Sequence, residues 1–107
     1  MEEWKLKKTR RRYLSFHLHS EESKLDNKQI GLAIWQNMLS LYGEVCVADS
    51  KLYLVEFDEK TGLGILQCTA SSLDKVVTSA VLIETIGKCL VSFEPKKTSG
   101  TIKSLKG

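Results

Sequence analysis

KKTRRRYLSFHLH, residues 7–19, is the stretch from which the fold can be worked out. Five of its first six residues are basic, and the seven that follow alternate along the chain. In a β-strand, successive side chains point to opposite faces of the sheet. The apolar side chains at 14, 16 and 18 therefore share one face, and those at 13, 15, 17 and 19 share the other. We expect a cationic arm leading into a central, two-faced strand.

The remaining sequence predicts one small domain with basic ends. A chain of 107 residues favours a single domain, which we place at 12–95 between a basic arm (1–11) and a basic tail (96–107). No apolar run approaches the roughly 18 residues of a membrane span, and the basic N-terminus does not continue into a signal peptide. We therefore expect no membrane partner and a cytoplasmic location. Cys46, Cys68 and Cys89 form no CxxC pair, which favours buried thiols over a zinc site.

Positive charge is concentrated at the two ends of the chain. Residues 1–12 carry six basic and two acidic side chains, and residues 95–107 carry four basic and no acidic ones, although the net charge is only +3. Such segregation is typical of proteins that bind a polyanion, and solvated tails that aid solubility are the alternative. The candidate RNA-binding residues are Lys7, Lys8, Arg10, Arg11, Arg12, Tyr13, Lys96, Lys97, Lys103 and Lys106.

Hydrophobic periodicity predicts four strands and two helices. The strands are Arg12–His19, Lys51–Phe57, Leu63–Thr69 and Cys89–Phe93, the last ended by Pro95, and Val45–Val47 is a short β-branched run. One helix runs from a capping box at Asp26 to Gly43. The other begins at a Ser71 or Ser72 cap and ends at Gly87, although its many β-branched residues leave a strand as the alternative.

The order β-α-β-β-α-β predicts an α+β fold of the split β-α-β type, also called ferredoxin-like or RRM-like. It is a two-layer sandwich in which two helices cover one face of a four-stranded antiparallel sheet. The first strand lies between the third and the last. The second face of the sheet, which carries Tyr13, is then open to a partner.

Several residue groups have both a chemical and a structural interpretation. Tyr13 can stack a base, but Leu63–Thr69 carries no aromatic residue, so phosphate binding by the basic ends is the better prediction. His17 and His19 share a face but lack a third metal ligand at fitting spacing, and the acidic hairpin Glu56–Glu59 is typical of an exposed turn. We predict no catalytic residue and no bound metal or cofactor in this chain.

Three stretches together resemble ribonuclease P protein component 2, the archaeal small subunit whose eukaryotic counterpart serves both RNase P and RNase MRP. They are Arg11–Phe16 (RRYLSF), Thr61–Cys68 (TGLGILQC) and Thr98–Lys103 (TSGTIK). The resemblance implies the same α/β sandwich and a subunit of a holoenzyme whose catalytic RNA removes the 5′ leader of precursor tRNA with Mg²⁺ held by the RNA. It also implies a larger, barrel-shaped protein partner of the component 3 type.

Other functions stay open at this point. A ferredoxin-like regulatory module, which binds a small molecule between two copies of the chain, explains the fold but not the basic ends. An RNA-binding module outside RNase P explains both. A stand-alone nuclease needs grouped carboxylates, and the acids here are scattered along the chain. Self-association is a further possibility that the sequence does not decide.

Overall fold

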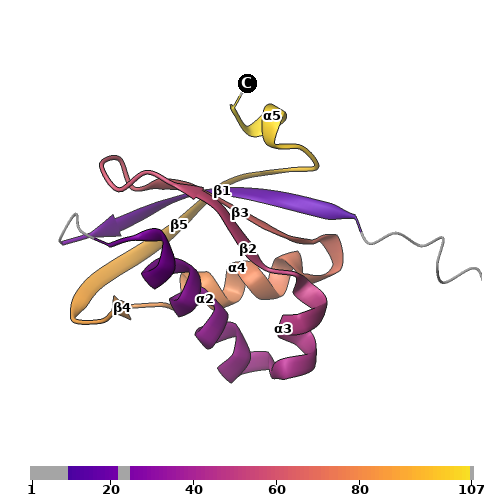
Figure 1. The fold of residues 1–107 in the computed structure, drawn as a ribbon, viewed down its shortest axis with the longest axis horizontal. Coiled ribbons are helices and arrows are strands. Elements are labelled where there is room, and N and C mark those ends of the chain that lie inside the picture. The colour runs from indigo at the N-terminus through magenta and orange to yellow at the C-terminus, as the bar shows by residue number, and fades with distance from the viewer. Residues whose placement is uncertain (1–9, 22–24, 107) are drawn as a thin grey trace, which may run out of the picture.

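The computed structural model describes residues 10–21 and 25–106, in which five strands form one antiparallel sheet. Helices α2, α3 and α4 lie on one side of this sheet, and α5 lies on the other (Figure 1). The elements in chain order are β1 (Arg11–Ser20), α2 (Asn27–Tyr42), α3 (Glu44–Ser50), β2 (Tyr53–Phe57), β3 (Leu63–Thr69), a 3₁₀ turn η1 (Ala70–Ser72), α4 (Leu73–Val81), β4 (Thr85–Ile86), β5 (Cys89–Ser99) and α5 (Ile102–Lys106).

The sheet has the order β2-β3-β1-β5-β4, so β1 lies between β3 and β5 as predicted. The prediction of four strands is wrong, because β4 adds a short fifth strand at the edge, where Thr85 pairs with Leu90. Gly87, with φ of 63°, turns the chain between β4 and β5. The prediction that Gly87 ends the preceding helix is wrong, because α4 already ends at Val81.

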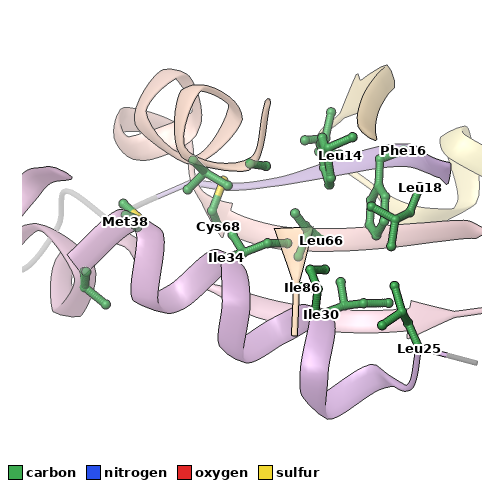
Figure 2. Close-up of a cluster of buried hydrophobic side chains, with 14 of the residues drawn as sticks. Leu14, Phe16, Leu18, Leu25, Ile30, Ile34, Met38, Leu66, Cys68 and Ile86 are labelled. Carbon is green, nitrogen blue, oxygen red and sulfur yellow. The ribbon is translucent and has the colours of Figure 1, made fainter. Parts of the chain in front are cut away.

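The apolar face of β1 forms the centre of the core. Leu14, Phe16 and Leu18 are each no more than 5 % exposed, and they lie beside the side chains of β3 on the sheet face that α2 covers (Figure 2). The ring of Phe16 stacks on that of Phe93, with 4.6 Å between centroids. Burying a residue of this size stabilises the fold by roughly 1.5–3 kcal/mol. The alternation in residues 13–19 thus decides which face of the sheet the helices cover.

Helix α2 follows the sequence prediction closely. Asp26 accepts a hydrogen bond from the amide of Gln29, whose side chain bonds back to the amide of Asp26, which completes the capping box. Ile30, Ile34 and Met38 recur every four residues and are fully buried along one face. Gly43, with φ of 91°, ends the helix.

The segment after Gly43 is helical, where the prediction placed a short β-branched run. Val47 packs into the core and Val45 is 76 % exposed, so α3 presents one face to the protein and one to water. Tertiary packing thus outweighs the preference of valine for strands. Lys51 ends this helix, and β2 therefore begins at Tyr53, two residues later than predicted. The Ser72 side chain makes no capping bond, since η1 leads directly into α4.

Strand β5 continues through Pro95 to Ser99, so the prediction that Pro95 ends it is wrong. A bulge lies here, because Ser15 pairs with Lys97 and Phe16 with Pro95. The Ser15 hydroxyl bonds both the carbonyl and the amide of Lys97, at 3.2 Å and 3.1 Å. A bulge accommodates a residue without an amide hydrogen. Strand β5 consequently stays paired with β1 as far as Tyr13, which lies opposite Ser99.

The sheet face opposite α2 and α4 is only partly open. Alternation places Tyr13 and Ser15 there, as predicted, and both are half-buried. Helix α5 contacts β1 and β5 on this side (Figure 1). Among the described residues, no helix is both long enough and apolar enough to span a bilayer.

Candidate nucleic-acid interface

The arginines at the start of β1 are held by the backbone of β3 and the turn after it. Arg11 pairs with Thr69 and Arg12 with Cys68. The amide of Ala70 donates a 2.7 Å hydrogen bond to the carbonyl of Arg10. These three predicted residues therefore have ordered backbone. Lys7 and Lys8 lie outside the described residues.

An open hollow of about 690 Å³ lies at this end of the sheet. Its lining residues are Arg10, Arg11, Arg12, Tyr13, Lys51, Thr69 and Gly100. Among the described residues that line it, four are cationic and none is acidic. Closely placed cations produce a positive potential that attracts phosphates. Guanidinium groups add donors that match phosphate oxygens in pairs.

The third stretch of the family resemblance closes the hollow from the C-terminal side. Gly100 lies so close to Arg12 that a Cβ at position 100 would stand 2.9 Å from Nη1. Thr101 caps the start of α5, because its hydroxyl accepts a 3.2 Å bond from the amide of Ser104. Ser99 accepts a bond from the Thr101 amide. This motif thus forms the turn that brings the end of β5 beside the arginines.

Lys51 is a cation of the site that the sequence analysis missed. It has φ of 50°, the left-handed conformation, and it ends α3 at the rim of the hollow. Non-glycine residues adopt this conformation at a cost of about 1 kcal/mol. In the sequence Lys51 is an isolated base in the acidic middle of the chain. The charge pattern therefore gave no signal for it.

Lys96, Lys97 and Lys103 do not join the hollow. Lys96 donates to Oε2 of Glu94 at 3.1 Å, and Lys97 lies at the bulge opposite Ser15. Lys103 is exposed on α5, which also contains Lys106. Hydrogen bonds from His19 and then from Lys96 hold the pKa of the Glu94 carboxyl below its ordinary value of 4.5. Lys96 is therefore partly neutralised and is a weaker phosphate ligand than the arginines.

A row of polar and aromatic side chains crosses the sheet next to the hollow. Gln67 on β3 pairs with Tyr13 on one side and with Tyr53 of β2 on the other. Residues paired across strands face the same way, so both rings flank Gln67. Tyr53 is 61 % exposed. The sequence showed that β3 lacks an aromatic residue, but only the register reveals that Tyr53 shares this face.

The acidic hairpin between β2 and β3 stabilises its own turn. Asp58 accepts a 2.8 Å hydrogen bond from the amide of Lys60, and its carbonyl accepts one from the amide of Gly62. Among the described residues, the carboxylates of this hairpin do not come together with a third metal ligand. The hairpin is an exposed turn, as its sequence predicts.

Comparison with known proteins identifies close relatives. A model of the Rpp14/Pop5 family matches residues 12–107. The chain is 37 % identical over 99 residues to ribonuclease P protein component 2 of Archaeoglobus fulgidus, covering 92 % of this chain and 87 % of that protein. It is 34 % identical to the protein of the same name from Pyrococcus furiosus, covering 91 % and 80 %.

A solved structure shows the same fold at low identity. A chain in the cryo-EM structure of yeast ribonuclease MRP superimposes with a TM-score of 0.68 at 10 % identity. The match covers 87 % of this chain and 76 % of that one. At this identity the likeness extends to the fold alone.

Proposed function

The chain belongs to the Rpp14/Pop5 family and is a protein component 2 of ribonuclease P, a subunit of that ribonucleoprotein, and from this premise we propose that it helps the catalytic RNA to remove the 5′ leader of precursor tRNA. The hollow lined by Arg10, Arg11, Arg12 and Lys51 carries the proposal. Its cations bind RNA phosphates and offset their repulsion when the RNA compacts. Mg²⁺ held by the RNA supplies the activated water.

The tyrosine row extends this RNA surface across the sheet. Strands are about 4.8 Å apart, so Tyr13 and Tyr53, two strands from each other, are separated by roughly 10 Å. That spacing is too wide for both rings to hold one base. Each ring can stack an unpaired base of its own. The proposal therefore assigns phosphate binding to the hollow and base stacking to the rings of Tyr13 and Tyr53.

A second surface, which adjoins the hollow at Lys51, is suited to the larger, barrel-shaped protein subunit. Between α2 and α3 lies a mainly apolar groove of about 420 Å³ whose lining includes Trp35, Leu39, Val47 and Leu52. Trp35 is 42 % exposed although it is large and apolar. Exposed aromatic residues at the edge of an apolar groove are typical of protein interfaces. We place the partner of the component 3 type here, and a second copy of the chain is the alternative occupant. The proposal locates the assembly in the cytoplasm.

Reconstitution tests this function. The protein is mixed with the larger subunit and a cognate catalytic RNA, and cleavage of precursor tRNA is measured at limiting Mg²⁺. We expect strong stimulation by the wild type and little by the Arg10→Ala, Arg11→Ala, Arg12→Ala variant. A matched control replaces three exposed lysines elsewhere, Lys28, Lys60 and Lys88, by Ala, and it should stimulate like the wild type. Equal cleavage with and without the wild-type chain would contradict the proposal.

A further inference from the structure

The polar face of β1 carries a second cluster, at the opposite end of the strand from the hollow. His17 and His19 are two residues apart and therefore share a face, and their ring centroids are 4.0 Å apart. The register with β5 pairs His17 with Glu94. Within the part of the chain that the structure describes, these three form the one group of potential metal ligands, all within 4.8 Å of one another.

Sequence spacing alone reveals no third ligand for the two histidines, and the fold provides one from β5. The pairing of β1 with β5 brings Glu94 to His19, and Nε2 lies 2.8 Å from Oε1. Around a tetrahedral Zn²⁺ with bonds of about 2.0–2.1 Å, ligand atoms are roughly 3.3 Å apart. The His19–Glu94 separation is 2.8 Å, and all three ligand atoms lie within 4.8 Å of one another. Rotation of the exposed His19 and Glu94 side chains adjusts these separations without any change in the sheet.

We propose that His17, His19 and Glu94 bind a Zn²⁺ ion at the surface, with a fourth position open to water. Two imidazoles and one carboxylate are a donor set that Zn²⁺ uses when it keeps an exchangeable position. Mg²⁺ favours oxygen ligands instead. The proposal is independent of the RNA-binding hollow, whose lining residues it does not include.

The surroundings orient two of the three ligands. Lys96 holds Oε2 of Glu94 at 3.1 Å, which leaves Oε1 directed at His19. Carboxylates that bind a metal ion through one oxygen are commonly held in place by a hydrogen bond to the other oxygen. The ammonium of Lys96 also repels a dication, but solvent screens this effect because both side chains are nearly half exposed.

The hairpin turn confines the ring of His17. A Cβ on Gly62 would lie 3.0 Å from its Cδ2 and 3.2 Å from its Nε2. Gly62 itself is fixed, since its carbonyl accepts a 2.7 Å bond from the amide of Leu18 and its φ is 80°. The glycine thus allows the turn to pack against the imidazole. One side of the cluster is therefore shaped by backbone that cannot easily move.

Zn²⁺ titration of the full-length protein, followed by calorimetry and by NMR of the imidazole C–H protons, tests the site. The chain has two histidines in all, so the imidazole signals report on this cluster alone. We expect one Zn²⁺ per chain, a shift of both histidines, and no binding of Mg²⁺. His19→Gln and Glu94→Gln should each weaken Zn²⁺ binding at least tenfold.

Two variants serve as controls. Glu59→Gln removes a carboxylate that lies near the cluster but outside it, and Cys46→Ser removes the most accessible thiol. Both should bind Zn²⁺ like the wild type. Absence of binding, imidazole signals that do not move on Zn²⁺ addition, or equal affinity in His19→Gln and Glu94→Gln would overturn the proposal. All three ligands are at least partly exposed, so we expect these variants to fold, which circular dichroism verifies.

Discussion

Arg12 lies beside Gly100, with Nη1 of the guanidinium 2.9 Å from the place that a Cβ of residue 100 would take. This proximity joins the first strand of the sheet to the turn after the last. It explains in physical terms why the C-terminal motif contains glycine, because a side chain here would displace the arginine. The turn after the last strand thus meets the basic start of β1 at Arg12, although Lys96, Lys97 and Lys103 do not line the hollow.

Gly100→Ala should weaken RNA binding without weakening the fold. The added methyl displaces only the flexible end of Arg12, so the free energy of unfolding should change by no more than about 0.5 kcal/mol. RNA affinity should fall several-fold, because the guanidinium leaves its place in the hollow. Filter binding and urea denaturation measure the two quantities. Gly31→Ala, where the new Cβ meets Leu54 at an ordinary 3.9 Å, is the control, and an equal loss of affinity there would contradict this account.

Lys51→Gly should also lower RNA affinity without destabilising the fold. Glycine adopts the left-handed conformation of this residue freely, so the variant should be as stable as the wild type or up to about 1 kcal/mol more stable. It also removes one cation from the hollow, so RNA affinity should fall. Unchanged RNA affinity would exclude Lys51 from the site.

Gly64→Ala should destabilise the fold by about 1–3 kcal/mol. Gly64 lies opposite Phe16 in the sheet, and a Cβ there would stand 2.8 Å from Cε1 of the ring and 3.0 Å from the carbonyl of Glu56. The buried ring cannot move aside. In a double-mutant cycle by urea denaturation, Phe16→Leu should recover part of the loss. If the two substitutions changed the free energy of unfolding in a strictly additive way, the Phe16 ring and the added methyl group would not compete for the same space.

The Cys68 thiol should make stability fall with rising pH in alkaline solution. Burial raises its pKa from 9.0 to about 11, so the thiol ionises more easily in the unfolded chain. Its contribution to stability is then complete below pH 9 and is lost as the pH rises to about 11. Because tyrosine and lysine also titrate there, the measurement is the difference in unfolding free energy between wild type and Cys68→Ala. A difference independent of pH would contradict this assignment.

Local sequence signals predicted the elements whose conformation is determined by residues close together in the chain. The alternation around Phe16 identified the buried face of β1, and the capping box at Asp26 identified the start of α2. Val45–Val47 was misread, because packing against the core, and not valine's intrinsic preference, decides its conformation. Pro95 was misread because the bulge that accommodates it is created by the partner strand.

The candidate site was predictable only where it is continuous in the chain. Three adjacent arginines give a charge signal that a sequence displays. Lys51 and Tyr53 enter the surface through the fold of α3 and the register of β2. Glu94 reaches His19 by the register of β5 in the same way. Strand register is a long-range property, and one sequence does not reveal which residues it brings together.

The salt dependence of RNA affinity tests the central claim most directly. Each phosphate contact contributes about 0.7–0.9 to the slope of log affinity against log salt concentration. Replacing Arg10, Arg11 and Arg12 by Ala should therefore lower the magnitude of that slope by about 2–3. The Lys28→Ala, Lys60→Ala, Lys88→Ala control has the same change in net charge and should keep the wild-type slope. A slope that is unchanged in the arginine variant, or equally reduced in both, would contradict the phosphate-binding hollow.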